Sequence, residues 1–377
     1  MVRVSLALEG VRVLDLSRVL SGPLCARILA DLGAEVIKVE PPGGDDSRHF
    51  GPFTEAGDST YFRLINRNKY GVTLDLKTDE GRRKLEGLIR RSDVLVENFR
   101  PGVLARLGFP ADELLRVNPG LIAVSVSGFG QTGPLASRPA YDLIVQAMSG
   151  LMSVTGPDGG PGVRVGISIG DIVPALYAAV GVLAALRERE STGRGQHIDV
   201  SMFEGLLSVF ESNAMRALHT DEEITPTGAH HAVSAPYGVF TAGDGRAVAI
   251  GVASDSLFER LATVLGRPEW LTAPGYGSDA ERGHNRERLR LEVEAALAGM
   301  DAEEVQRVLA GAGIPCGPVL DVREALALAE GRDLIVTEPD GFRTLAGGVR
   351  TTGTVTEFRP APALGEHDHL IEGWIDG

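Results

Sequence analysis

The sequence predicts an α/β fold, with a large doubly wound, Rossmann-like domain and a smaller inserted α+β domain. In the first third of the chain, apolar runs rich in β-branched residues alternate with helical segments, as in a parallel sheet covered by helices on both faces. In the middle, Asp244 and Gly245 form a hairpin signal between two apolar runs. Strand-like runs resume beyond Gly331, so we expect the tail to return to the first domain.

The alternating pattern gives the elements of the first domain in order. Gly33 ends the first helical segment, as a glycine at a helix C-terminus commonly does. The expected strands are 11–15, 34–39, 93–97, 121–127 and 197–201, and the expected helices are 23–32, 79–91, 103–107, 172–190 and 202–219. Ligands of doubly wound sheets bind beyond the carboxyl ends of the strands. Those ends lead into the loops 17–21, 41–48, 98–100 and 127–133.

A linker over residues 221–226 marks a change in character. Beyond it we expect strands at 238–242 and 247–252 and helices at 255–265, 285–297 and 302–311. The expected large domain, with its linkers, covers residues 1–220 and 331–377, and the small α+β domain covers residues 225–330.

The composition favours a soluble cytoplasmic protein. The formal net charge is −14, which argues against nucleic-acid binding because that function needs a basic face. Cys25 and Cys316 are too few for a disulfide framework or a zinc site, so each is expected to fill a gap in a core. No signal peptide is apparent. The longest apolar segment, residues 172–186, is shorter than a membrane span, so no membrane contact is expected.

Asp171 stands out because it lies between a glycine-rich loop and an apolar helix. The loop, residues 156–166, contains five glycines and two prolines. One interpretation is an N-cap, because an aspartate oxygen accepts the free N–H groups of a first helical turn. The other is a carboxylate nucleophile, kept ionised by the helix dipole and approachable across small residues. The two interpretations are compatible.

Two other patterns resemble ligand sites. Gly128, Gly130 and Gly133 have the GxGxxG spacing, but prolines follow where a dinucleotide site needs a helix to begin. His230 and His231 are adjacent in a loop of small residues, without the neighbouring ligands that a metal site requires. The histidines are either loop residues satisfied by backbone and water, or contacts for a substrate carboxylate or carbonyl.

Several motifs together resemble the family III CoA transferases, the CaiB/BaiF-type superfamily that contains formyl-CoA transferase, the carnitine CoA transferases and the α-methylacyl-CoA racemases. The motifs are DLSRVLSGP at 15–23, LGAEVIKVEPP at 32–42, VENFRPG at 96–102, PAYDLIVQA at 139–147, GD at 170–171, TGRGQ at 192–196, GAGIPCGP at 311–318 and LGEH at 364–367. The resemblance covers nearly the whole chain, in order.

The resemblance implies an enzyme with an aspartate nucleophile, which aligns with Asp171. The nucleophile attacks a donor acyl-CoA to give an aspartyl-acyl anhydride and then an aspartyl-CoA thioester, from which CoA passes to an acceptor carboxylate. The resemblance also implies a homodimer of two interlocked ring-like chains, a large domain built from both chain ends, and no metal or permanently bound cofactor. Coenzyme A enters only as the thioester substrate.

Residue by residue, the resemblance extends to the CoA contacts. They align with Val19, Leu74, Lys77, Asn98, Phe99 and Arg106. A basic family residue near the adenine falls here on Pro41, so Arg48 or Arg138 would have to supply that contact. Asp142 matches an acidic position near the nucleophile, for positioning or charge control, with an N-cap of the following helix as the alternative.

Tyr141 separates the two branches of the family. Racemases have a histidine at this position as a base for the α-proton, whereas the pKa of a tyrosine is too high for that role without a large shift. We therefore favour transfer over racemisation. The loop GAHHAVSAPY at 228–237 resembles members that use succinyl-CoA and a short dicarboxylate such as itaconate, mesaconate, citramalate or malate. His230, His231 and an arginine such as Arg48 would hold the distal carboxylate. A CoA-binding protein without catalysis is the remaining alternative.

Overall fold

The computed structural model describes residues 6–349 and 358–376. Contacts divide the chain into two compact units, each described here by itself. The first comprises the described residues within Met1–Met152, Arg164–Glu222 and Glu330–Gly377, and the second comprises Ser153–Val163 and Glu223–Ala329. Residues 153–163, which the sequence-based division placed in the large domain, group with the second unit here.

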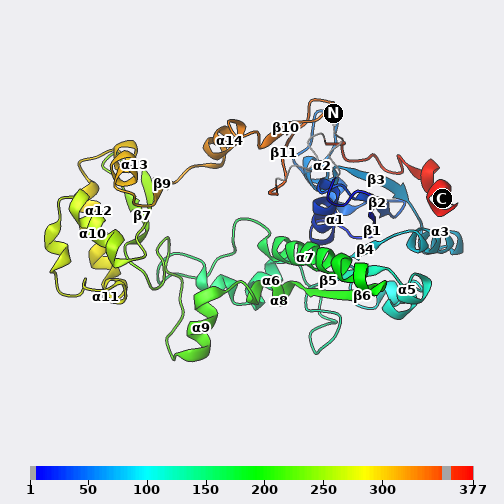
Figure 1. The fold of residues 1–377 in the computed structure, drawn as a ribbon, viewed down its shortest axis with the longest axis horizontal. Helices are drawn as coiled ribbons and strands as arrows, with labels where there is room; N and C mark the ends of the chain where they lie inside the picture. The colour runs from blue at the N-terminus through cyan, green and yellow to red at the C-terminus, as the bar shows by residue number, and fades with distance from the viewer. Residues whose placement is uncertain (1–5, 350–357, 377) are drawn as a thin grey trace. The chain divides into compact units, whose positions relative to one another are not determined.

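A parallel six-stranded sheet forms the centre of the first unit (Figure 1). Its strands are β1 (Arg12–Asp15), β2 (Glu35–Glu40), β3 (Lys69–Thr73), β4 (Val94–Glu97), β5 (Ile122–Ser127) and β6 (Gln196–Ser201). The order is β3-β2-β1-β4-β5-β6, and every neighbouring pair is parallel. The prediction of a mixed α/β fold with a parallel sheet is confirmed. The order reverses next to β1, which is where doubly wound sheets bind ligands.

Helices cover both faces of this sheet. On one face, α1 (Ser21–Asp31), α6 (Asp142–Met148), α7 (Ile169–Thr192) and α8 (Met202–Leu207) share a core with alternate residues of the strands. On the other face lie α3 (Asp79–Arg90), α4 (Val103–Arg106), α5 (Ala111–Val117) and the C-terminal α15 (Ile371–Asp376). The two cores explain the continuous apolar runs, because strands buried on both faces lose the alternation of a half-exposed strand.

The pattern missed α2 (Thr60–Asn66), β3 and α5. Strand β3 begins with Lys69, a charged residue that is nonetheless fully buried. Its ammonium bonds Asp15 Oδ2 at 2.8 Å and the Pro23 carbonyl at 2.9 Å. At Gly71 of the same strand, an added Cβ would come within 2.8 Å of Pro362. Because β3 is stabilised by a buried ion pair and by close contact with the chain tail, its sequence lacks the apolar run that identifies the other strands.

Helix α7 is longer than expected. It begins at Ile169 and spans 24 residues, so by length and composition it could cross a membrane, which corrects the expectation that this segment is too short. This is weak support for a span, because core helices of soluble proteins pass the same test. Val173, Ala178 and Val182 of α7 belong to the buried core beside the sheet.

The expected helix over 202–219 is wrong as a single helix. The structure has α8 and a separate α9 (Glu211–His219). Glu211 adopts a φ of +48°, in the left-handed region, so the helix cannot continue through it. Neither glycine nor proline marks the break.

The second unit is α+β. Its sheet has the order β7-β8-β9, with β7 (Tyr237–Thr241), β8 (Ala247–Gly251) and β9 (Cys316–Pro318) antiparallel. Gly245 adopts a φ of +80° in the predicted turn between the first two strands. The helices are α10 (Asp255–Val264), α11 (Asp279–His284), α12 (Arg286–Leu297), α13 (Ala302–Gly311) and α14 (Val322–Glu330).

The chain tail packs onto the first unit. Strands β10 (Ile335–Thr337) and β11 (Arg343–Leu345) form a separate hairpin. His367 Nδ1 accepts the Gly71 N–H at 3.1 Å, and Trp374 of α15 is buried in the core beside α3. Strand β3 at the sheet edge is therefore covered by residues almost 300 positions later in the chain.

Candidate active site

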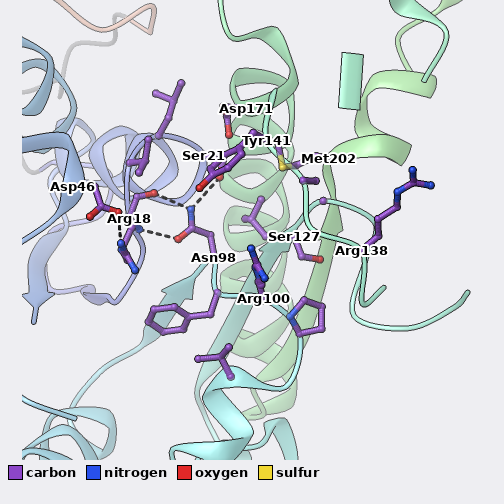
Figure 2. A pocket seen from close by; sticks show the side chains of 18 residues that line it. Arg18, Ser21, Asp46, Asn98, Arg100, Ser127, Arg138, Tyr141, Asp171 and Met202 are labelled. Atoms are coloured by element: carbon purple, nitrogen blue, oxygen red, sulfur yellow. Dashed lines mark hydrogen bonds and ion pairs between the residues drawn. The ribbon is translucent and has the colours of Figure 1, made fainter. Parts of the chain in front are cut away.

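A pocket of about 380 Å³ opens in the first unit where the strands end (Figure 2). Its lining residues come from the loops after β1, β2, β4 and β5 and from the starts of α6, α7 and α8. They are Arg18–Ser21, Asp46, Asn98–Pro101, Val103, Val126–Gly128, Arg138, Ala140, Tyr141, Asp171 and Met202. Each of the four strand-end loops expected to bind a ligand contributes to this lining.

Asp171 lies in the first turn of α7 and lines this pocket. The N-cap position is Ser168, which lies three residues earlier, and no side chain caps the helix there, so the N-cap interpretation of Asp171 is wrong. Burial raises the pKa of Asp171 to about 7, and the negative charge of Asp142 adds to the rise. The direction of this pKa shift is opposite to the one expected for a carboxyl group kept ionised by a helix end, because burial disfavours the charged form.

Asp142 caps α7 from outside that helix. Its Oδ1 accepts the Gly170 N–H at 2.9 Å, which satisfies a free amide of the first turn of α7. Gln146 Nε2 donates to both Asp142 carboxylate oxygens at 2.9 Å, and Arg164 Nη2 lies 3.2 Å from Oδ2. Asp142 does not act as the N-cap of its own helix, because Tyr141 holds that position.

Two tyrosines flank Asp171 in different ways. Tyr141 lines the pocket and is 79% exposed. Tyr61, on α2, was missed by the sequence analysis; it packs against a small buried cluster that includes Ala175 of α7. Burial raises the pKa of Tyr61, with Asp171 the largest electrostatic contributor. Its phenol therefore stays protonated, and the motif pattern gave no sign of its position.

The expected CoA contacts fall into two groups. Val19, Asn98 and Phe99 line the pocket with Asp171. The other three, Leu74, Lys77 and Arg106, are outside its lining. Leu74 is buried in a core, whereas Lys77 and Arg106 are exposed after β3 and on α4. The structure thus brings half of the expected contacts together with Asp171 in this pocket.

The basic side chains of the pocket were partly predicted. Arg138 and Arg100 line it and are exposed, and neither takes part in an ion pair within the described ranges. Arg18 is paired with Asp46. Arg48 lies outside this lining, and its guanidinium bonds Glu40 at 2.7 and 2.6 Å and stacks on Phe62. Arg138 and Arg100 are therefore the candidates for phosphate contact within this pocket, and the expectation for Arg48 stays a prediction.

A buried carboxyl group supports the loop after β4. Glu97 Oε2 accepts the Phe99 N–H at 2.7 Å. Burial raises the pKa of Glu97 to about 7 against opposing hydrogen bonds from Ser125 and Phe99.

Ser127, at the end of β5, lines the pocket with a buried hydroxyl that has no hydrogen-bond partner within residues 6–349 and 358–376. A bound substrate could supply that partner.

His230 and His231 belong to the second unit and line a pocket of about 600 Å³ there. His231 Nδ1 accepts the N–H groups of Val233 and Ser234 at 3.2 and 3.0 Å. This leaves Nε2 as the protonated ring nitrogen of a neutral His231. Burial and the charge of Arg290 lower the pKa of His230. The lowered pKa makes the His230 ring a neutral hydrogen-bonding group rather than a cation near neutral pH.

Among the described residues, neither Cys25 nor a cluster of possible metal ligands forms a second reactive site. Cys25 is fully buried, and burial with the charge of Asp15 raises the pKa of its thiol to about 12. A thiol of this kind is unreactive at neutral pH. Within the part of the chain that the structure describes, no cluster of three or more histidine, cysteine or acidic side chains could hold a metal ion.

Comparison with known proteins gives a consistent result. The sequence model of CoA-transferase family III matches residues 8–368. The acetyl-CoA:oxalate CoA-transferase of Acetobacter aceti is 46% identical over 325 residues, which cover 85% of this chain and 83% of the relative. The succinyl-CoA–D-citramalate CoA-transferase of Chloroflexus aurantiacus is 37% identical over 97% of this chain and 92% of its own. A crystal structure of a CaiB/BaiF family protein from Brucella suis has a TM-score of 0.85 and 34% identity, covering 99% of this chain and 100% of the other.

Proposed function

This chain belongs to CoA-transferase family III, and we propose that it moves CoA from an acyl-CoA to a free carboxylic acid through Asp171. One observation carries the proposal. Asp171 is the only carboxyl group among the described lining residues that has neither an ion pair nor a side-chain hydrogen bond, since Asp46 is paired with Arg18. An unengaged, partly buried carboxylate beside strand-end loops is suited to nucleophilic attack on a thioester.

The proposed reaction returns the enzyme to its starting state. An Asp171 oxygen attacks the thioester carbonyl, the C–S bond breaks, and a mixed anhydride and CoA thiolate result. The thiolate then attacks the aspartyl carbonyl, which gives an aspartyl-CoA thioester and releases the donor acid. The acceptor carboxylate attacks this thioester to form a second anhydride, again with loss of thiolate. Attack of thiolate on the acceptor acyl carbon gives the new acyl-CoA and restores Asp171.

The environment of Asp171 suits these intermediates. Anhydrides hydrolyse, so the reaction needs a site from which water is excluded. The same burial that raises the pKa of Asp171 to about 7 removes its hydration shell. A desolvated carboxylate is a stronger nucleophile once ionised, although a smaller fraction is ionised below neutral pH. Asp142 holds the Gly170 amide and hence the direction of the first turn of α7.

We propose contacts for CoA at Val19, Leu74, Lys77, Asn98, Phe99 and Arg106, as the family resemblance implies. CoA has both a pantetheine arm and a nucleotide, so one small pocket does not hold it all. Val19, Asn98 and Phe99 would contact the thioester end in the pocket with Asp171. Lys77 and Arg106 are exposed cations outside the pocket and would contact phosphates.

We propose a short dicarboxylic acid as the acceptor, of the itaconate, mesaconate, citramalate or malate type, and succinyl-CoA as the donor. The names of the two relatives above support this class, because oxalate and citramalate are both dicarboxylic acids. His230 and His231 would donate hydrogen bonds to the distal carboxylate. If His230→Ala and His231→Ala leave the preference for dicarboxylic over monocarboxylic acceptors unchanged, this part of the proposal is wrong.

We also propose a cytoplasmic homodimer of interlocked chains. Leu176, Tyr177 and Val180 on α7 are 50%, 42% and 61% exposed, which is unusual for apolar residues on a core helix and fits coverage by a second copy. The mass in solution, measured by light scattering or native mass spectrometry, tests the dimer. A monomer at micromolar concentration would contradict it.

Product analysis tests the activity itself. The protein is mixed with succinyl-CoA and a panel of mono- and dicarboxylic acids, and the CoA esters are separated by chromatography. We expect a new acyl-CoA with wild type and none with Asp171→Ala. Deuterium incorporation at the α-carbon of a branched acyl-CoA, without transfer, would favour the racemase despite Tyr141. CoA binding with neither reaction would favour the non-catalytic alternative.

A further inference from the structure

The Val19 backbone is strained at the edge of the pocket. Val19 has a φ of +65°, in the left-handed region. A β-branched residue avoids this region because its side chain crowds the backbone. Such a conformation persists only where the surroundings impose it, and it is found disproportionately at functional sites. Val19 lines the pocket that holds Asp171, so whatever imposes its conformation also shapes the binding surface.

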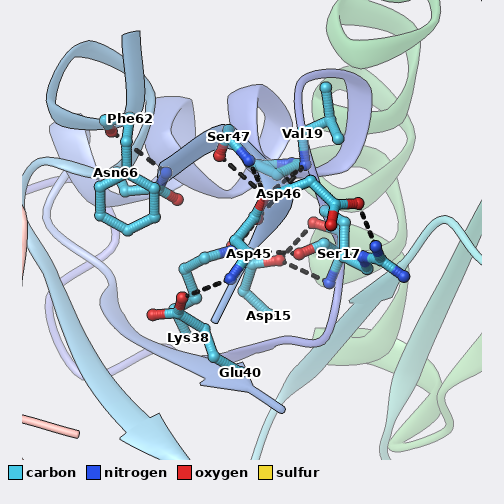
Figure 3. Close-up of polar contacts among 12 residues, drawn as sticks. Asp15, Ser17, Val19, Lys38, Glu40, Asp45, Asp46, Ser47, Phe62 and Asn66 are labelled. Atoms are coloured by element: carbon cyan, nitrogen blue, oxygen red, sulfur yellow. Dashed lines mark hydrogen bonds and ion pairs between the residues drawn. The ribbon is translucent and has the colours of Figure 1, made fainter. Parts of the chain in front are cut away.

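Side chains from several strand ends hold the turn that contains Val19. Lys38 Nζ donates to the Ser17 carbonyl at 3.0 Å. Asn98 accepts the Arg18 N–H and donates to the Arg18 carbonyl, both at 2.8 Å. The Val19 N–H points to Asp45, at 3.2 Å from Oδ1 and 3.3 Å from Oδ2 (Figure 3). The strained residue is thus fixed through its own amide by one carboxylate.

The Asp45 carboxylate is itself held in place by Lys38 and Ser47. Lys38 Nζ lies 2.8 Å from Oδ2, and the side chains of both residues are at most 1% exposed. Ser47 donates its N–H and its hydroxyl to Oδ1 at 2.9 and 2.8 Å. Burial would raise the pKa of Asp45, but Lys38 and Ser47 outweigh it and lower that pKa to about 2. The carboxylate is therefore ionised throughout the physiological pH range.

This arrangement does more than stabilise the core. A buried ion pair is weak support for stability, because hydrophobic residues of similar volume often replace one without loss. Here the carboxylate has an additional partner that a hydrophobic residue could not satisfy, namely the Val19 amide. We propose that Asp45 is a positioning residue that holds the Val19 backbone in its left-handed conformation for contact with acyl-CoA. The inference rests on the proposed function, since it assumes that acyl-CoA occupies the pocket.

Asp45→Asn tests the role of Asp45. The amide replaces one acceptor oxygen with a donor that faces Lys38, Ser47 or Val19, all of which are donors themselves. We expect the dissociation constant for CoA and the KM for acyl-CoA to rise about tenfold, with kcat changed much less. If Asp45→Asn does not fold, Asp45→Glu keeps the charge beside Lys38 but displaces the carboxylate, and it is expected to weaken CoA binding as well.

Asp31→Asn is the matched control. Asp31 is also a buried carboxylate at 6% exposure, paired with Arg67 at 2.7 Å, but it lies at the far end of α1 from the pocket. Both variants are expected to lower the melting temperature, and only Asp45→Asn is expected to weaken CoA binding. Equal losses of CoA affinity in the two variants, or none in Asp45→Asn, would overturn the inference.

Val19→Gly provides a second, independent readout, because glycine adopts a φ of +65° without a steric cost. In the Asp45→Asn background, Val19→Gly is expected to recover part of the lost affinity for CoA, so the two changes are not additive. Additive effects would show that Asp45 does not act through the Val19 conformation. The same assays on wild type test the proposed function separately. If wild type neither binds CoA nor turns over an acyl-CoA, the proposed function is wrong, whatever the Asp45 variants show.

Discussion

Asp142 Oδ1 accepts the N–H of Gly170 at 2.9 Å, and this single hydrogen bond joins the acidic residue of the PAYD motif to the helix turn that carries Asp171. The contact explains two properties of the site together. It replaces the missing N-cap of α7, and it brings a second negative charge close to Asp171. Asp142 therefore orients the proposed nucleophile and also raises the pKa of that nucleophile.

The pH profile of kcat/KM should fall on the acid side of about pH 7. Only ionised Asp171 can attack, and its pKa in the free enzyme is about 7. Asp142→Asn removes a neighbouring negative charge, so the acid limb should move to lower pH. We expect the acid limb to shift by about one pH unit or less. The kcat should also fall, because an amide at position 142 cannot accept from Gly170, Gln146 and Arg164 together.

Glu97→Gln is the control for this assignment. Burial also raises the pKa of Glu97 to about 7, so Glu97 could in principle produce the same acid limb. If Asp171 produces it, the limb moves with Asp142→Asn and keeps its position with Glu97→Gln. A limb that disappears in Glu97→Gln would assign the titration to Glu97 and contradict the account.

Asp171→Asn should be more stable than wild type at pH 8. Between the ordinary carboxyl pKa of about 3.9 and the native value of about 7, the folded protein keeps a proton that the unfolded chain has lost. The free energy of unfolding of wild type therefore falls as pH rises through this window. At pH 4 we expect Asp171→Asn and wild type to have the same free energy of unfolding. At pH 8 the free energy of unfolding of the variant should be higher by about 2 kcal/mol, after allowance for partial exposure. Denaturant titrations at both pH values measure it.

Arg100→Ala and Arg138→Ala should raise the KM for acyl-CoA. Both side chains are exposed at the pocket and form no ion pair with residues that the structure describes, so CoA phosphates would be their partners. We expect an increase of about three- to tenfold each at low salt, and a smaller one at high salt because of screening. Arg187→Ala removes an exposed arginine, paired with Glu190, from the far end of α7 and should change KM little.

Gly195→Ala should destabilise the protein severely. An added Cβ would lie 1.8 Å from the Leu121 carbonyl oxygen, at the point where the chain enters β6 beside β5. The backbone would have to move, at a cost of about 3 kcal/mol or more. Gly120→Ala is the matched control, because its nearest neighbour would be Asn118 Oδ1 at an ordinary 3.6 Å. Thermal unfolding of the two variants should separate them clearly.

The parallel sheet could be predicted because its central strands are buried on both faces and read as apolar runs. Strand β3 could not, because Lys69 is stabilised by Asp15, a partner 54 positions earlier in the chain. The strand-end loops and Asp171 could likewise be located from the pattern. The ionisation of Asp171 could not, because it depends on burial and on a carboxylate that the fold brings from α6. The electrostatic coupling of Tyr61 to Asp171 was also missed, because it depends on the fold rather than on a local sequence motif.

The most direct test of the account is whether Asp171 becomes covalently acylated. Intact-protein mass is measured after mixing with succinyl-CoA, and the adduct is trapped with hydroxylamine or borohydride and located by peptide mapping. We predict a modified carboxyl group at Asp171 in wild type and none in Asp171→Ala. Transfer of CoA to an acceptor with no adduct at Asp171, or with the same adduct in Asp171→Ala, would contradict the central claim.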